Sequence, residues 1–378
     1  MNSQAIPEKE STREILYLAF ELSNKKWKLG FSDGKEPRIR QVTIDARDLE
    51  ACRKEIEKAK HRFGMSGSAE VRSCYEAGRD GFWLHRALEK MGVGNIVVDA
   101  SSIEVNRRQR RAKTDRMDVE KLNRQLVRYW RGEHDVWQVV RVPSPEAEHQ
   151  RQLHRGLETL KEERKQHRVR IQSLLVTQGI DMKVGPHFLK KLEGLTDWEG
   201  QPIAAELKRR LEDEHHRLQL VEAQIRESQK TQREQLKAAA KDAAMEKVAK
   251  LQRLISIGMG SSWVFVMEMF GWRRFQNRRE VAGAVGLTPT PYNSGDRVRE
   301  QGISRAGNPR VRKLAIEIAW CWLRLQPNSK LSQWYQQRFG GGGARMRRIG
   351  IVAMARRLMI DLWRYLESDT VPQGAVVR

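Results

Sequence analysis

Apolar and polar residues alternate in short runs over the first part of the chain, and these runs predict strands. Residues 15–22 form a mostly apolar run, and residues 26–32 and 38–44 alternate between apolar and polar positions. A period of two places alternate side chains on opposite faces of a sheet. Asp33-Gly34, a common turn pair, lies between the second and third runs. The three runs therefore predict three strands joined by short turns in an antiparallel meander.

The pattern then changes to one that alternates between helix and strand periods. The predicted elements are a helix at 46–62, a strand at 70–75, a helix at 81–91 and a strand at 95–98. Three strands, a helix, a strand, a helix and a strand follow the order of the ribonuclease-H-like fold. We therefore expect an α/β domain of this class at 14–135, after a flexible tail at 1–13.

Residues at four- and three-residue spacing mark two seams in the middle of the chain. The first seam consists of Leu153, Leu157, Leu160, Arg164, His167, Ile171 and Leu174, and the second of Leu207, Leu211, Glu214, Leu218, Val221 and Ile225. Two such helices around a tip at 179–202 predict a long helical arm at 136–250, either an antiparallel coiled coil or a dimerising arm. His154 and His167 are expected on its surface and not as metal ligands.

The last third of the chain is rich in glycine and arginine and predicts a mainly helical domain at 251–367, followed by a tail at 368–378. Residues 281–312 are interpreted as a glycine-spaced loop that carries several arginines. Glycine lets a backbone approach a phosphate closely, and arginine can bind a phosphate through two hydrogen bonds. Serines are common in such loops, so the residues alone predict that Ser294 is a turn residue.

Charge narrows the class of partner. The 378 residues carry a formal net charge of +23, with a pI of about 10.2, which favours a polyanion and above all a nucleic acid. The candidate contacts are Arg107, Arg108, Arg110, Arg111, Lys113, Arg297, Arg299, Arg305, Arg310 and Arg312. No run approaches 18 apolar residues and the N-terminus is polar, so neither a membrane span nor a signal peptide is expected. Three isolated cysteines fit a reducing cytoplasm.

Four acids form the candidate metal site. Glu21 lies near the end of the first predicted strand, Glu76 follows the fourth, and Asp115 and Asp118 are three residues apart on the next helix. In the expected fold the first and fourth strands are neighbours, so the four carboxylates would repel one another unless a cation bound them. Mg²⁺ or Mn²⁺ suits such oxygen ligands. Each acid taken alone is more often an ordinary surface residue, whereas the four together on this topology favour a metal site. Asp99 is the reserve candidate.

Several motifs resemble those of one known family. They are Tyr75-Glu76-Ala77-Gly78, Lys113-Thr114-Asp115-Arg116-Met117-Asp118, Gly286-Leu287-Thr288-Pro289, Ser294-Gly295, and Gly302-Ile303-Ser304-Arg305 followed by Gly307-Asn308 and Arg312. The chain resembles the DEDD-type transposases of bacterial insertion sequences, which are bridge-RNA-guided recombinases with a RuvC-like N-terminal domain and a C-terminal serine-bearing domain. The family usually has aspartate in its first strand, where this chain has Glu21.

The resemblance implies a function. Ser294 would attack a scissile phosphate and form a transient phosphoserine link to DNA, while Glu21, Glu76, Asp115 and Asp118 hold the metal ion. Ser304 would be structural or contact a phosphate. The expected partners are donor and target DNA, a structured guide RNA, and further copies of the chain joined through the arm, in the bacterial cytoplasm near the nucleoid. Two alternatives stay open: a metal-dependent junction nuclease that uses only the acids, and a non-catalytic nucleic-acid-binding scaffold.

Overall fold

The computed structural model describes residues 14–35, 39–103, 115–238, 242–294 and 297–378, and within these it leaves out the side chains of residues 101, 115–116, 291–294 and 297–301. The chain divides into two compact units, Met1–Val142 and Pro143–Arg378, and each is described by itself. No helix in the described part of the chain is long and apolar enough to cross a membrane.

The first unit contains a five-stranded mixed sheet. Its strands are β1 (Ile15–Leu22), β2 (Lys26–Ser32), β3 (Arg40–Asp45), β4 (Glu70–Glu76) and β5 (Gly94–Val98), in the spatial order β3-β2-β1-β4-β5. The first three strands pair antiparallel, as their short turns require, whereas β4 lies parallel to both β1 and β5. All five strands predicted from the sequence are confirmed, with ends that differ by one or two residues.

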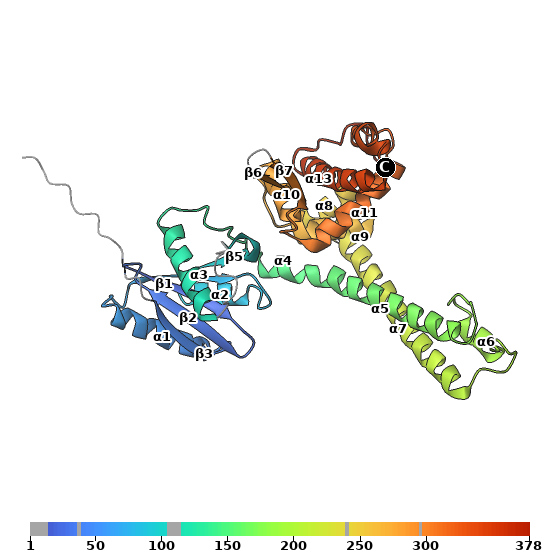
Figure 1. Cartoon of the computed structure of the whole chain (residues 1–378), viewed down its shortest axis with the longest axis horizontal. Coiled ribbons are helices and arrows are strands. Elements are labelled where there is room, and N and C mark those ends of the chain that lie inside the picture. Colours follow the sequence, from blue (N-terminus) through green and yellow to red (C-terminus); the bar gives the residue numbers. More distant parts are fainter. Residues whose placement is uncertain (1–13, 36–38, 104–114, 239–241, 295–296) are drawn as a thin grey trace, which may run out of the picture. The chain divides into compact units, whose positions relative to one another are not determined.

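Helices cover both faces of this sheet (Figure 1). The apolar faces of α1 (Leu49–Arg62) and α2 (Trp83–Lys90) pack on the strand residues around Leu18 and Trp27. Helix α3 (Asp115–Trp130) covers the opposite face, against Tyr17, Ala19 and Cys74. Successive residues of β1 thus enter different cores, which is why the strand is apolar throughout instead of alternating. A short 3₁₀ turn, Ala100–Ser102, follows β5.

A buried amide fixes α3 on the sheet. Asn123 donates hydrogen bonds to the carbonyl oxygens of Tyr17 (3.1 Å) and Gly30 (2.7 Å), and its Oδ1 accepts one from Ser32 Oγ at 2.7 Å. Farther toward the helix N-terminus, Val119 lies directly over Gly30, where no side chain intervenes. Because a buried amide is costly without partners, these bonds hold the helix in one register.

The second unit begins with a helical arm. Its helices are α4 (Pro145–His149), α5 (Arg151–Val176), α6 (Phe188–Glu193) and α7 (Ala205–Ala238). The two long helices, α5 and α7, lie side by side, and α6 packs near their far end (Figure 1). Leu157, Val221 and Ile225 are buried between them. This arrangement supports two long helices around a tip, whereas supercoiling and dimerisation of the arm stay predictions.

The remainder of the second unit is mainly helical. It consists of α8 (Ala243–Gln252), α9 (Met259–Phe265), a π-helical turn (Val266–Phe270), α10 (Arg278–Val285), β6 (Pro289–Ser294), β7 (Arg297–Ile303), α11 (Pro309–Leu325), α12 (Lys330–Tyr335), a second π-helical turn (Gln336–Gly340) and α13 (Ala344–Ser368). Trp263, Trp322 and Leu358 lie in its core. Pro289–Ser294 and Arg297–Ile303 pair as the two antiparallel strands of a hairpin, so the interpretation of 281–312 as a loop was wrong.

Candidate functional site

Two of the four candidate acids follow neighbouring strands. The parallel pairing of β1 and β4 extends to Phe20 and Tyr75, and Glu21 and Glu76 are the next residue of each strand. Phe20 and Tyr75 lie in the core beneath α1 and α2, whereas Ala19 and Cys74 face α3. Since side chains alternate along a strand, Glu21 and Glu76 lie at the same end of the sheet and on the α3 face.

The direction of α3 brings its first turn to the same end. Val119 lies over Gly30, which pairs with Ala19, and four residues later Asn123 donates to the carbonyl oxygen of Tyr17. The helix therefore runs opposite to β1, and its N-terminal turn, which contains Asp115 and Asp118, points toward the carboxyl end of that strand.

The carboxylates fit a hard divalent cation by their chemistry, because oxygen ligands from acids are what Mg²⁺ and Mn²⁺ bind. Glu76 is exposed, and Glu21 and Asp118 are partly exposed. The side chain of Asp115 is outside the described residues. Among the side chains that are described, no group of three or more His, Cys, Asp or Glu is placed to hold a metal ion. The metal site therefore stays a prediction that the positions of the elements support.

Ser294 is the last residue of β6 and pairs with Arg297, the first residue of β7. The predicted serine thus lies at the far end of a hairpin, next to residues 295–296. The side chains of Ser294, Arg297 and Arg299 are outside the described residues, as is the whole basic run at 107–113. What the structure does describe is how the hairpin is held at its base.

The base of the hairpin is a backbone-to-backbone clamp. The Arg305 N–H donates to the Gly286 carbonyl oxygen at 3.2 Å, and the Asn308 N–H donates to the Ala284 carbonyl oxygen at 2.9 Å. Gly286 and Gly307 have positive φ angles of 70° and 106°. A Cβ at Gly286 would lie 2.0 Å from the Ala306 carbonyl oxygen, and one at Gly307 would lie 2.4 Å from that of Ala284. Only glycine fits either position.

Two residues of the downstream motif, Ser304 and Arg312, support the same clamp, and the neighbouring Arg310 contacts the arm. Ser304 Oγ accepts a hydrogen bond from Thr288 Oγ1 at 3.0 Å. Arg312 Nη1 donates to the carbonyl oxygens of Arg305 (2.9 Å) and Val285 (3.3 Å), and Arg310 Nε donates to Glu158 of α5 at 2.7 Å. Arg310 and Arg312 thus contact protein groups, while Arg305 is exposed.

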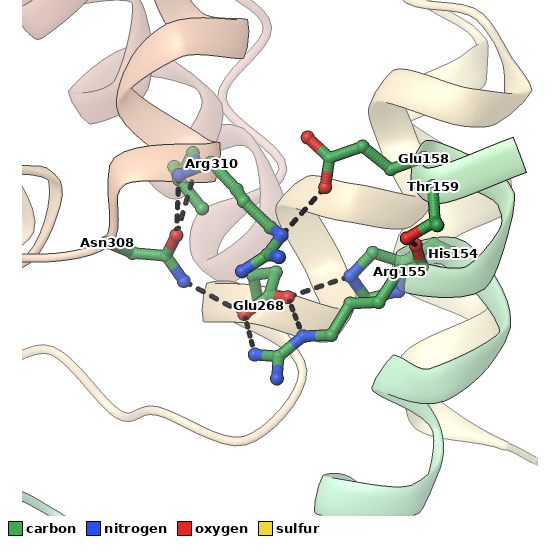
Figure 2. Close-up of polar contacts among 8 residues, drawn as sticks. His154, Arg155, Glu158, Thr159, Glu268, Asn308 and Arg310 are labelled. Carbon is green, nitrogen blue, oxygen red and sulfur yellow. Dashed lines mark hydrogen bonds and ion pairs between the residues drawn. The ribbon is translucent and has the colours of Figure 1, made fainter. Parts of the chain in front are cut away.

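A buried carboxylate nearby was not anticipated from the sequence. Glu268, on the first π-helical turn, is 1% exposed. Its Oε1 accepts from His154 Nε2 and Arg155 Nε, both at 2.8 Å, and its Oε2 accepts from Arg155 Nη2 at 3.0 Å and Asn308 Nδ2 at 2.9 Å (Figure 2). Burial alone would raise the pKa of this carboxyl, but these hydrogen bonds and the Arg155 charge hold it well below its usual range.

This cluster, which we call the Glu268 cluster (His154, Arg155, Glu268 and Asn308), joins three parts of the second unit (Figure 2). His154 and Arg155 belong to α5. Asn308 caps α11, where its Oδ1 accepts from the N–H groups of Arg310 and Val311, and it also follows the hairpin. The chemistry of the cluster is a fully partnered buried anion, and its position links the arm to the base of the hairpin.

The predicted surface position of His154 was therefore wrong, because α5 packs against Glu268 and its neighbours and buries the imidazole. His167 is also largely covered, since its Nδ1 lies 2.7 Å from Glu214 Oε2 of α7. One signal in the sequence could have indicated the cluster. Glu268 is the only acid within the apolar run 263–270, and an acid in such a run is rarely buried without a cationic partner.

Comparison with known proteins shows to which family the chain belongs. A family model described as "Transposase IS116/IS110/IS902 family" matches residues 248–335, which include the hairpin, Glu268 and Asn308. "Putative transposase y4rJ" of Sinorhizobium fredii (strain NBRC 101917 / NGR234) is 37% identical over 376 residues, covering 96% of this chain and 94% of that protein. "Putative transposase y4qE" of the same strain is 29% identical over 250 residues, covering 66% and 58% respectively. Because the first similarity extends over nearly the whole of both proteins, the chain belongs to the IS116/IS110/IS902 family of transposases.

Proposed function

We propose that this transposase cleaves and rejoins DNA through a covalent bond to Ser294, assisted by a divalent cation held by Glu21, Glu76, Asp115 and Asp118. Transposition is the function of its family, which implies DNA as a partner. One observation carries the metal part of the proposal. Glu21 and Glu76 end adjacent parallel strands on the α3 face, and α3 begins at that end with Asp115 and Asp118.

In the proposed first step the Ser294 hydroxyl oxygen attacks phosphorus and the bond from phosphorus to the leaving deoxyribose oxygen breaks. The leaving oxygen takes up a proton, and the serine proton passes to a base. Arginines beside Ser294 in the hairpin cannot be that base, because a guanidinium has no acceptor. The phosphoserine bond retains the energy of the cleaved phosphodiester, so rejoining needs no ATP. A bound Mg²⁺ or Mn²⁺ would stabilise negative charge on the phosphoryl, attacking or leaving oxygens.

A structured guide RNA and self-association through the arm belong to the same proposal. The net charge of +23 supports binding of more than one polyanion, since both RNA and DNA need neutralising. The exposed length of α5 and α7 offers a surface for a second copy.

The serine mechanism is tested by looking for the covalent product. Protein, element RNA and labelled DNA are incubated with Mg²⁺, and the DNA is examined for an adduct that survives SDS and is removed by protease. Ser294→Ala should abolish the adduct. Ser304→Ala is the matched control, because Ser304 directly follows β7 and the substitution removes one side-chain hydrogen bond while leaving the backbone bonds of the clamp, so the adduct should be retained. Cleavage by Ser294→Ala at the wild-type rate would favour the junction nuclease.

The metal site is tested separately. Glu76→Ala or Asp115→Ala should abolish cleavage and weaken Mn²⁺ binding in calorimetry, while DNA binding is retained. Glu21→Asp should retain some activity, because the carboxylate is kept and the family usually has aspartate there. If Ser294 and Asp115 serve the same step, the double variant should be no worse than either single variant. Unchanged Mn²⁺ affinity in all three acid variants would contradict the proposed ligands.

A further inference from the structure

A second candidate site lies in the C-terminal part of the second unit. A cavity of about 850 Å³ opens between α10, α12, α13 and the segment at 370–373. Six of its lining side chains are cationic and one is acidic, and we call it the basic cavity. The cationic residues are Arg278, Arg279, Lys330, Arg356, Arg357 and Arg364, and the acid is Asp361.

Most of these cations form no ion pair with the residues that the structure describes. Within the described part of the chain, no carboxylate lies within ion-pair distance of Arg278, Arg279, Lys330 or Arg356. Arg364 Nη1 lies 3.6 Å from Asp361 Oδ1, so the single acid offsets only a fraction of the charge. Cations gathered in one concave site repel one another and favour the binding of an anion.

The walls of the basic cavity are fixed by the fold. Arg356, Arg357, Ile360 and Arg364 share one side of α13, whose opposite side, including Leu358 and Leu362, is buried in the core. The Arg357 guanidinium lies 4.0 Å from the centre of the Trp334 ring of α12. The backbone N–H of Lys330 donates to the Gln373 carbonyl oxygen at 2.9 Å, which ties the C-terminal segment to α12. The backbone that carries these cations is therefore set by the fold, and the Arg357 side chain is also held against Trp334.

The volume of the basic cavity limits the size of the ligand that it can hold. A volume of about 850 Å³ falls within the range of roughly 300–1,000 Å³ that is usual for small-ligand sites, so the cavity has room for a short stretch of one strand. Several arginines gathered in one cavity suit successive phosphates of one strand, and Trp334 also lines the cavity, with Arg357 over its ring. A duplex would contact only the rim.

The basic cavity also adjoins the hairpin. Thr288 lines the cavity, and the next residue starts β6, which ends at Ser294. Six residues of extended strand span about 20 Å. We propose that the basic cavity binds the sugar–phosphate backbone of a single polynucleotide strand, and so anchors it on one flank of the hairpin. The inference rests on the proposed function in taking a polynucleotide as the ligand, and it does not depend on the serine chemistry.

The test compares two triple variants of the full chain. Arg278→Gln/Arg279→Gln/Arg356→Gln removes three charges from the cavity. The matched control, Arg209→Gln/Arg226→Gln/Arg233→Gln, removes three exposed arginines from α7 that have no described ion-pair partner. Fluorescence anisotropy measures binding of single-stranded DNA, single-stranded RNA and duplex DNA of about 12 units, a length within the usual single-strand site size. The buffer contains a chelator, so no cleavage occurs.

The cavity variant should bind one of the single strands about tenfold more weakly or worse. The slope of log affinity against log salt should fall by about 2, since each lost phosphate contact contributes roughly 0.7 for single strands. The DNA and RNA arms identify which strand the cavity takes. The control should change affinity by less than about threefold. A variant with Lys at the same three positions should retain most of the affinity, because it retains the charge.

The proposal would be overturned if the cavity variant bound both single strands with the affinity and salt slope of the wild type. It would also be overturned if the α7 control lost as much affinity as the cavity variant. Arg279→Glu provides a second test that does not depend on the folding of the triple variant. Arg279 is exposed in the first turn of α10, where an acid is favourable for the helix, and the reversal should weaken binding further. Ser294→Ala should bind like the wild type. Strand binding without an adduct in the wild type would reject the serine mechanism and leave the cavity inference standing.

Discussion

Glu268 shows how a single residue can be both costly and necessary. A carboxylate that is 1% exposed loses nearly all its hydration, and only complete partnering makes that tolerable. Here four donor atoms from His154, Arg155 and Asn308 surround its two oxygens. Removing the carboxylate would leave those donors, including the buried imidazole of His154, without their acceptor. The residue therefore contributes more to specifying the local arrangement than to any net gain in stability.

Glu268→Gln should lower the free energy of unfolding by about 3 kcal/mol, because breaking one partner of a buried ion pair typically costs ~3–5 kcal/mol and the amide retains part of the hydrogen bonding. Urea denaturation followed by tryptophan fluorescence measures the change. Glu158→Gln is the control, since its ion pair with Arg310 is exposed and should contribute only about 0–1 kcal/mol. Equal effects of the two substitutions would show that the cluster is not tightly coupled.

The same carboxyl predicts a pH dependence. Its pKa is lowered in the folded chain, whereas an unfolded glutamate titrates near ~4.3. A depressed folded pKa stabilises the protein fully above the unfolded value, and this stabilisation is lost as the pH falls toward the folded value. The stability gap between wild type and Glu268→Gln should therefore be constant near neutrality and shrink below about pH 4.3. Unfolding curves across this range measure the gap, and one that widens on acidification would contradict the assigned direction.

The position of some residues could be predicted from the sequence, whereas that of others could not. Glu21 and Glu76 could be placed at one sheet end because strand order alone determines which strand ends meet. The burial of His154 could not be predicted, since it depends on how α5 crosses the π-helical turn carrying Glu268. That crossing is a tertiary contact between residues more than a hundred positions apart, and neither local period nor composition encodes it.

At the scale of elements, the hairpin β6–β7 depends on its clamp. Gly307→Ala should destabilise the C-terminal domain by more than about 1 kcal/mol, because the residue has a positive φ and its Cβ would meet the Ala284 carbonyl oxygen. Gly283→Ala is the matched control. A Cβ there meets nothing within 4 Å, and alanine is favoured over glycine inside a helix by roughly 0.5–1 kcal/mol. Thermal unfolding should separate the two variants in opposite directions, and adduct formation should fall only in Gly307→Ala.

The sheet and the hairpin show which strands the pattern of apolar and polar residues can predict. The five strands of the first unit have long apolar or alternating runs, since each buries at least one face, and all five could be predicted. The hairpin has few apolar residues because neither strand is part of a larger sheet, so its glycines and arginines resembled a loop. Gly286 and Gly307 are explained by the tight contact between two backbone segments at the base, and the close approach of a phosphate to this region stays a prediction.

At the scale of the whole molecule, charge is the dominant property. The chain has 71 Lys and Arg against 48 Asp and Glu, and the excess of 23 charges repels itself unless a polyanion is bound. Several cations nevertheless contact protein groups, including Arg155, Arg310 and Arg312, and these cannot contribute fully to nucleic-acid binding. The net charge therefore sets the class of partner, while the number of phosphate contacts depends on the cations left free, such as those of the basic cavity.

Nucleic-acid binding by the intact chain should accordingly depend steeply on salt. With roughly 6–10 phosphate contacts, the affinity for duplex DNA should fall about 10³–10⁵-fold between 50 and 200 mM salt, because each contact releases condensed counterions. Titrations at several salt concentrations give the slope, which counts the contacts directly. Glu268→Gln changes the formal charge by one without altering an exposed cation, so its slope should match the wild type under conditions where it is folded. A slope near zero for the wild type would mean that the basic residues serve folding or protein contacts.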